Sequence, residues 1–456
     1  MGEQAQRAAP AAHGVPFGEA VRFWTKLGFI SFGGPTGQMA VMHQELVERK
    51  RWIGNRRFLH ALNFCMLLPG PEATQLAIYV GWLLHRVRGG VVAGVMFVLP
   101  GFAIMLGLSW VYAVHGEVAL IGGVFSGLQA AVIGIVAAAL IRIGGRALHD
   151  PVLVSVAAGA FLAIFVAGVP FPFIIVGAGL IGFLGGRGWP DRFHLREDAD
   201  DRDDAAIADL GPGAPHTRPT IARALRVIFI GTTVWILPLV AVSLFPGAPG
   251  VLADESVFFS KAAMVTFGGA YAVLAYINQA AVYQFGWLLP GQMATGLGLA
   301  ESTPGPLIMV TEFVGFLAGY RNPGGLDPVL AGVLGATVAT WATFAPCFLW
   351  IFLGAPYIER LRGNVTLTHT LSAVTAAVVG VILNLAVTFG VYVLFEGVRS
   401  ARFLWAELPV PSLGTVDPFA LVVAALSFVA LWRFRLSIVW VVLASAVAGV
   451  GRVALG

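Results

Sequence analysis

The feature that most constrains this chain is a series of long apolar runs. A helix needs roughly 17–25 predominantly apolar residues to span the hydrocarbon core of a bilayer. Runs that approach or exceed this length, the last two of them short, lie at about 89–114, 118–141, 151–187, 224–246, 327–353, 366–396, 417–432 and 436–451. Only 11% of the residues are charged, against about 25% in soluble globular chains. The sequence therefore predicts an all-α polytopic membrane protein embedded in a lipid bilayer.

The remaining composition narrows the partners and cofactors. The formal net charge is +4, but the basic residues gather in loops between the apolar runs, as membrane topology requires, so we expect no nucleic-acid partner. Cys65 and Cys347 lie in apolar segments, and no Cys or His spacing is typical of a metal site, so we expect no metal and no cofactor. Residues 1–16 lack the apolar core of a signal peptide and are predicted to form a flexible N-terminus.

Two apolar stretches, at 63–82 and 301–316, are interrupted by prolines. The interruptions are the tripeptides Pro69-Gly70-Pro71 and Pro304-Gly305-Pro306. Proline removes a backbone donor and breaks a continuous helix. An unpaired backbone group is costly in hydrocarbon, so such a break must be enclosed by protein or must face a polar cavity.

The chain contains an internal duplication. Residues 23–71 align without a gap with residues 258–306, and 13 of the 49 paired positions are identical. The identical pairs include two lysines, two tryptophans, two Phe-Gly-Gly tripeptides and the two Pro-Gly-Pro tripeptides. We therefore predict a first repeat over 17–187 and a second over 256–455.

Two segments are predicted to join the repeats. Residues 191–209 hold eight acidic and three basic side chains, so residues 188–222 are predicted to form a polar cytoplasmic linker. Residues 223–246 are predicted to form a connecting transmembrane helix. Residues 246–255, which include Asp254 and Glu255, are expected to lie outside.

The charges of the repeats differ in one informative place. The first repeat carries Arg49, Lys50, Arg51, Arg56 and Arg57, where the second has Gln284, Phe285, Gly286, Gly291 and Gln292. Basic residues mark the cytoplasmic side of a membrane. The same loop is therefore predicted to lie inside in one repeat and outside in the other, which is typical of an inverted repeat with a cytoplasmic N-terminus.

The breaks predict a binding site for an anion. A helix that begins at a break near the midplane exposes its first N–H groups and its positive dipole end, and four such starts would converge there. Lys26 and Lys261 stand seven residues before each Gly-Gly; they either mark the substrate path or extend to a membrane surface. The candidate substrate-binding residues are Lys26, Gly33, Gly34, Thr36, Pro69, Gly70, Pro71, Thr74, Gln75, Lys261, Gly268, Gly269, Pro304, Gly305 and Pro306.

Acidic and neutral polar residues also lie near the breaks. Glu72, Glu301 and Glu312 are candidate proton-coupling sites, although an acid at a helix start also serves as an ordinary cap. The neutral residues could either line a cavity or form helix–helix hydrogen bonds; besides Thr36, Thr74 and Gln75 they are Gln38, Asn63, Asn278, Ser302, Thr303 and Thr311.

At these residues the sequence resembles the chromate ion transporter family in its long-chain, two-repeat form. The stretches that carry the resemblance include "KLGFISFGGPTGQMAVMHQELVERKRWI", "LLPGPEATQLAIYVGW" and "GLAESTPGPLIMVTEFVGF". Met66 and Ala270 depart from the family pattern, which more often has glutamine and a third glycine there. The resemblance implies efflux of chromate across the inner (plasma) membrane, chromate resistance, and a link to sulfate, an analogous anion.

Other functions remain open at the level of sequence. A sulfate or broader oxyanion transporter, and a passive anion channel, both fit the repeat. A membrane enzyme or a receptor-like binding protein is disfavoured, because we find no nucleotide-binding loop, no catalytic triad pattern and no large soluble domain. The sequence sets no oligomeric state, and a homodimer is compatible with it.

Overall fold

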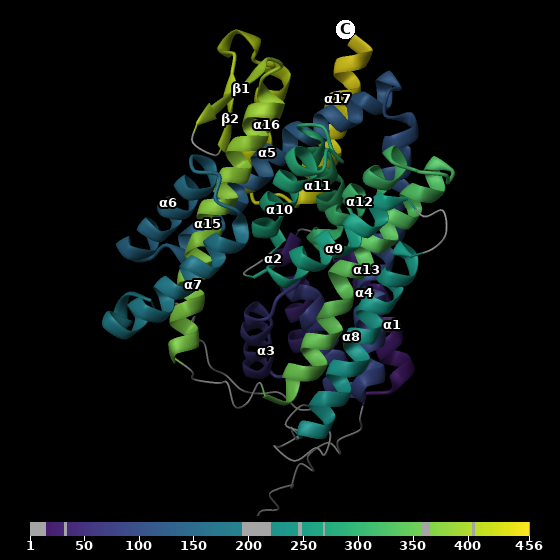
Figure 1. The fold of residues 1–456 in the computed structure, drawn as a ribbon, viewed down its shortest axis with the longest axis vertical. Helices are drawn as coiled ribbons and strands as arrows, with labels where there is room; N and C mark the ends of the chain where they lie inside the picture. Colours follow the sequence, from purple (N-terminus) through teal and green to yellow (C-terminus); the bar gives the residue numbers. More distant parts are fainter. Residues whose placement is uncertain are drawn as a thin grey trace, which may run out of the picture.

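The computed structural model describes residues 15–31, 34–193, 220–244, 249–267, 270–357, 365–403 and 406–455. Within these ranges the chain is almost entirely helical (Figure 1). Among the described residues, seven helices are long and apolar enough to cross a membrane by length and composition. The predicted all-α polytopic fold is confirmed.

The first repeat consists of eight successive helical elements. They are α1 (Phe17–Ile30), α2 (Gly34–His43), the π-helix η1 (Gln44–Arg49), α3 (Asn55–Leu67), α4 (Glu72–His115), α5 (Ala119–Ala147), α6 (Pro151–Phe165) and α7 (Phe171–Gly188). A short 3₁₀ turn, η2 (Pro190–Arg192), follows. The predicted linker lies largely outside the described residues, as does most of the predicted N-terminal segment.

The second repeat shows the same order of elements after the connecting helix α8 (Ile221–Ser243). They are α9 (Gly250–Met264), α10 (Ala270–Gln279), the π-helix η4 (Ala280–Gln284), α11 (Gln292–Ser302), the 3₁₀ turn η5 (Leu307–Met309), α12 (Val310–Arg321), α13 (Pro328–Gly354), the 3₁₀ turn η6 (Ala355–Tyr357), α15 (Val365–Leu394), α16 (Pro418–Trp432) and α17 (Ile438–Leu455). A two-stranded antiparallel hairpin, β1 (Val398–Phe403) and β2 (Ala406–Pro411), followed by the 3₁₀ turn η7 (Leu413–Thr415), separates α15 from α16.

Helix α4 corresponds to α12 and α13 together, because it folds back on itself. His85 and Arg86 have non-helical dihedral angles, with φ +56° at Arg86. A Cβ atom placed on Gly81 would lie 2.6 Å from the Cβ of Ala93, whereas these positions are about 18 Å apart in a straight helix. The first segment of α4 therefore returns along the second, as α12 does along α13.

The ends of the first-repeat helices meet on one side of the molecule. A ring nitrogen of His85 lies 2.7 Å from the Val15 carbonyl oxygen, and Lys50 Nζ donates to Glu19 Oε1 at 2.8 Å. The start of α1, the turn between η1 and α3, and the fold in α4 thus share one side, which we call face A. The pairs α1–α2 and α3–α4 each enter from face A and return to it.

The equivalent turns of the second repeat lie at the opposite end of α4. Arg321, at the end of α12, donates to the Trp287 carbonyl oxygen at 2.8 Å and to Gln292 Oε1 at 2.9 Å. Gln292 in turn donates to the Tyr112 hydroxyl at 3.0 Å, close to the C-terminal end of α4. We call this side face B. The second segment of α4, about 43 Å long at 1.5 Å per residue, connects the two faces.

Side chains at the helix starts explain several boundaries. Asp150, Asp327 and Asp417 each precede a proline, and each side chain accepts a hydrogen bond from the N–H two residues later. Aspartate satisfies the free donors of the first turn, and proline fits a position whose N–H needs no partner. These pairs set the starts of α6, α13 and α16.

Residues 250–255, which are predicted to lie outside, belong to a helix. Helix α9 begins at Gly250, and Glu255 is fully buried within it. A Cβ placed on Gly335 of α13 would lie 3.0 Å from Glu255 Oε1, so a glycine in α13 makes room for this carboxyl group.

Candidate functional site

The two Pro-Gly-Pro tripeptides are broken helix tips that are linked to the opposite repeat. Gly70 and Gly305 have φ of +120° and +108°, which favours glycine. The Gly70 N–H donates to the Thr266 carbonyl oxygen at 2.8 Å, and the Gly305 N–H donates to the Ser31 carbonyl oxygen at 2.9 Å. Ser31 and Thr266 are equivalent residues just past the ends of α1 and α9. Each tip therefore caps the end of a helix from the other repeat.

Each tip glycine also packs against an equivalent point of a long helix. A Cβ placed on Gly70 would lie 3.0 Å from the Sγ of Cys347, which follows Pro346 in α13. A Cβ placed on Gly305 would lie 3.4 Å from the Cα of Gly101, which follows Pro100 in α4. Cys347 is buried, as its apolar segment predicts.

Polar side chains surround the first tip, where α4 begins. Glu72, Thr74 and Gln75 are all buried. Gln75 Nε2 donates to the Pro69 carbonyl oxygen at 2.8 Å. Its Oε1 atom and the Thr74 hydroxyl have no hydrogen-bond partner in the described part of the chain. The first turn of α4 thus offers backbone N–H groups beside two side chains with unused polar atoms.

The second tip has fewer free side chains. Gln38 of α2 donates to the Gly305 carbonyl oxygen, a third contact between the repeats at this level. The hydroxyl groups of three residues donate to backbone carbonyl oxygens three or four residues earlier in the chain; these residues are Ser302, Thr303 and Thr311. For these three residues the structure shows backbone hydrogen bonds rather than a free hydroxyl.

A buried tyrosine–glutamate pair connects the second tip with the first Gly-Gly. Tyr271 of α10 donates a hydrogen bond to Oε1 of Glu301, which is 1% exposed. The other carboxyl oxygen has no partner within the described residues. A Cβ placed on Gly34 would lie 3.6 Å from that oxygen, and Gly34 has φ +66°. Sequence reasoning identified Gly34 and Glu301 but missed Tyr271, because the residue at its position in the first repeat is Thr36.

Two further acids are buried in the second repeat. Glu312 of α12 and Glu255 of α9 are fully buried, and none of their four carboxyl oxygens has a hydrogen-bond partner in the described chain. The alignment of residues 23–71 with 258–306 pairs positions that are 235 residues apart. The residues 235 positions before Glu312 and Glu255 are Ala77 and Ala20. The polar side chains are therefore distributed unequally over a nearly symmetric backbone.

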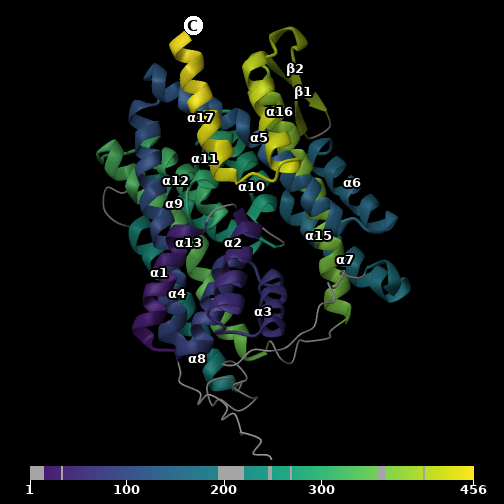
Figure 2. The same ribbon diagram turned by 180° about the vertical axis from the view of Figure 1, so that it is seen from behind.

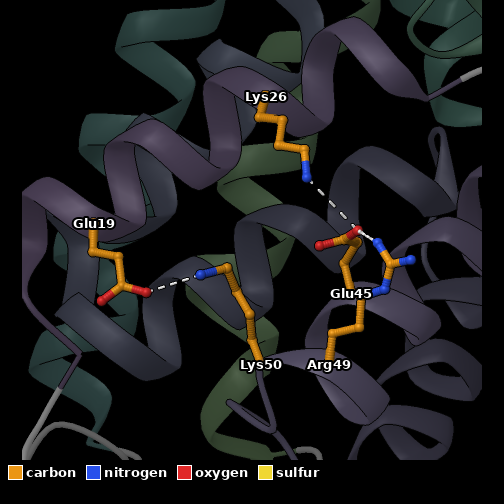
Figure 3. A network of polar contacts seen from close by, with 5 residues as sticks. All are labelled: Glu19, Lys26, Glu45, Arg49 and Lys50. Atoms are coloured by element: carbon orange, nitrogen blue, oxygen red, sulfur yellow. Dashed lines mark hydrogen bonds and ion pairs between the residues drawn. The ribbon is translucent and has the colours of Figure 1, made fainter.

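The two equivalent lysines lie on exposed helix faces. The Lys26 side chain is 59% exposed, and its Nζ lies 3.8 Å from Glu45 Oε1, which also binds Arg49 at 2.6 Å (Figure 3). Lys261 is also exposed, and Ala280 stands at the position of Glu45 in its repeat. Among the contacts of the described residues, neither lysine touches a tip.

Some predicted site residues cannot be placed. Gly33, Gly268 and Gly269 lie outside the described residues, and of Thr36 only the backbone, in α2, is described. They lie between described helices: α1 and α9 end, and α2 and α10 begin, beside them. With α4 and the η5–α12 segment, four helix starts face the middle of the molecule between faces A and B, where they can stabilise negative charge.

Two repeats of broken helices are an architecture common among secondary transporters. Comparison with known families specifies it further: the profile described as "Chromate transporter" matches residues 18–183 and 255–450. The chain belongs to the chromate transporter family.

Curated relatives agree with this assignment. The chain is 31% identical over 429 residues to a chromate transport protein of Pseudomonas aeruginosa, covering 93% of this chain and 89% of the relative. It is 30% identical over 381 residues to a chromate transport protein of Cupriavidus metallidurans, covering 82% and 84%. A probable chromate transport protein of Synechococcus elongatus is 28% identical over 421 residues, covering 91% and 95%. No solved structure shows a significant match.

Proposed function

We propose that this protein exports chromate, a tetrahedral dianion, from the cytoplasm across the inner membrane and so confers chromate resistance. The observation that carries the proposal is that each Pro-Gly-Pro tip donates a hydrogen bond to the end of a helix of the other repeat, where α4 and the η5–α12 segment begin. Thr74 and Gln75 add unused polar atoms there. The names of the curated relatives support chromate as the substrate.

The membrane potential favours the proposed direction of transport. Moving a dianion out of a negative-inside cell releases about 4.6 kcal/mol per 100 mV, twice the single-charge value. Export of chromate is therefore downhill without a coupled ion. A proton bound at Glu72, Glu301 or Glu312 would add the pH gradient to this driving force.

Transport into everted membrane vesicles tests the function. We expect saturable chromate uptake, since the cytoplasmic face is outermost, and competition by sulfate, which has the same shape and charge. Uptake of sulfate in preference to chromate would favour the broader oxyanion transporter. Flux that does not saturate, and that is not stimulated by substrate on the far side, would indicate a passive channel.

The inverted orientation of the repeats predicts labelling from opposite sides. We expect that Arg51→Cys reacts with a membrane-impermeant thiol reagent only from the cytoplasmic side, and Gly286→Cys only from outside, because the two turns lie on faces A and B. The native cysteines give little background, since both are buried. Labelling of both variants from the same side would contradict the inverted arrangement.

The lysines are proposed to attract the anion rather than to bind it at the tips. We expect Lys26→Ala and Lys261→Ala each to reduce chromate resistance and transport sharply at normal membrane levels, because a positive charge inside or beside the membrane lowers the barrier for an anion. Lys50→Ala, which removes a lysine paired with Glu19 at the surface, is the control. Parental transport by the Lys26→Ala/Lys261→Ala double variant would leave both residues with a purely interfacial role.

A further inference from the structure

The two equivalent half-helices α3 and α11 differ in how exposed their side chains are along one side of the helix, which we call the stripe. In α3, Asn55, Leu62, Met66 and the following Pro69 are half-buried, and their spacing places them on one side of the helix. Asn55 lies at the face A end of α3, and Leu62, Met66 and Pro69 lead to the first tip, while Phe58 between them is buried. A half-buried stripe of this kind is open to whatever surrounds the protein on that side.

The counterpart stripe in α11 is closed. Met293 to Glu301 are buried without a break, and Leu297 and Glu301 occupy the positions of Leu62 and Met66. Helix α5 covers α11: Gln129 donates to Thr295 Oγ1 at 2.5 Å, and α17 also packs against it. Helix α3 packs mainly against α4, and it stands apart from α7 and α15 in Figures 1 and 2. The described structure is thus closed along α11 and open along α3.

A strained arginine stands at the face A end of the open stripe. Arg51 is exposed and has φ +51°, a left-handed conformation that is uncommon and unfavourable for a residue with a side chain. Its counterpart Gly286 adopts φ +66°. The turn therefore favours glycine, yet the first repeat has arginine there.

The charge of Arg51 is also free. Arg49 pairs with Glu45 and Lys50 with Glu19, but Arg51 makes no hydrogen bond or ion pair with the described part of the chain. A positive charge at the mouth of a path that ends at an anion site raises the local concentration of the anion. A role in attracting the anion explains why the first repeat has an arginine in a turn that favours glycine.

We propose that Arg51 and the α3 stripe form the access path by which the transported oxyanion reaches the first tip from face A. The proposal rests on the proposed function, because it needs an anionic substrate. Arg51 attracts the dianion, and Leu62, Met66 and Pro69 border its way to the start of α4. In this conformation face B has no equivalent path, because α5 and α17 cover α11.

Kinetics of the turn variants test the role of Arg51. We expect Arg51→Gly to raise the KM for chromate from face A about threefold at low ionic strength, with kcat unchanged. The effect of one charge should be smaller than the tenfold or larger increase in local substrate concentration that charged clefts produce. The difference should vanish at high salt, because the Debye length falls from about 30 Å at 0.01 M to about 3 Å at 1 M. Arg51→Lys should keep the parental KM at both ionic strengths.

The chain offers matched controls for folding and for position. Arg51→Gly should melt at or above the parental temperature, because glycine relieves the left-handed strain. Gly286→Arg places the same charge on face B, where a Cβ meets no atom within 4 Å, and should leave the KM from face A unchanged. A parental KM for Arg51→Gly at low salt would overturn the role of Arg51. So would a KM effect seen in anionic vesicles but absent in phosphatidylcholine vesicles, because Arg51 would then bind lipid headgroups.

Cysteine labelling tests the stripe without relying on transport. We expect Leu62→Cys and Met66→Cys to react with an impermeant thiol reagent added at face A, and Leu297→Cys to be protected from both faces. Excess chromate or sulfate should slow the labelling of Met66→Cys. Reaction of the α3 variants only with a lipid-soluble maleimide would show that the stripe faces lipid and would overturn the path. If the parent transports no oxyanion while the labelling pattern holds, the proposed function fails and the water-accessible path remains.

Discussion

Replacing Gly70 and Pro71 together by alanine is expected to abolish chromate transport, and the same change at Gly305 and Pro306 is expected to do so as well. Alanine favours continuation of the helix, which would turn the free N–H groups of the first turn into intrahelical donors. Both glycines also have φ above +100°, where a side chain causes strain of about 1–3 kcal/mol, equivalent to about fivefold to more than a hundredfold in an equilibrium constant. Uptake into everted vesicles, beside immunodetection of the protein in the membrane, measures the effect.

A glycine with free space provides the matched control. Gly107 lies within α4, and a Cβ there meets no atom within 4 Å, so Gly107→Ala should transport like the parent. Recovery of transport on adding Cys347→Gly to the Gly70/Pro71 variant would contradict the prediction. That result would trace the loss to the contact between Gly70 and Cys347 rather than to the broken helix.

The second large effect is expected at Glu301. Glu301→Gln should remove the stimulation of chromate transport by a pH gradient, because glutamine keeps the size of the side chain and can still accept the Tyr271 hydrogen bond but cannot bind and release a proton. Tyr271→Phe frees the carboxyl group from its only partner in the described chain and should shift the pH profile of transport while leaving the gradient effect in place. The measurement is the initial rate in vesicles with and without an imposed pH gradient.

An acid far from the tips serves as the comparison for Glu301. Glu48 is on the surface beside His43, 3.3 Å away, so Glu48→Gln should respond to the gradient like the parent. Undiminished stimulation in Glu301→Gln would assign the coupling to Glu72 or Glu312, or would show that export is driven by the membrane potential alone.

Much of the fold could be predicted because its determinants are local. The apolar runs fix the helices, and the prolines of the two tripeptides fix the breaks whatever surrounds them. The gapless register pairs the repeats, and the structure keeps that register: Ser31 and Thr266, which are equivalent in sequence, accept the two equivalent tip hydrogen bonds.

The candidate site could be predicted only in part, because its details arise between the repeats. The Tyr271–Glu301 pair, the contact of Gly70 with Cys347 and the burial of Glu255 each join segments that no sequence register aligns. Arg51 was read only as a topological charge, since its φ cannot be inferred from composition.

We propose that an oxyanion binds beside the two broken tips, and the equilibrium binding of chromate measures this without relying on transport. Calorimetric titration of purified protein with chromate should give one dissociation constant for the parent and Gly107→Ala. It should give a constant weaker by at least about fivefold, or no binding, for Gly70→Ala/Pro71→Ala and for Gly305→Ala/Pro306→Ala, because about 1–3 kcal/mol at the tip corresponds to about fivefold to more than a hundredfold in affinity. Thermal melts identify the folded variants. A folded tip variant that binds chromate with the parental constant would contradict the account and place the site elsewhere.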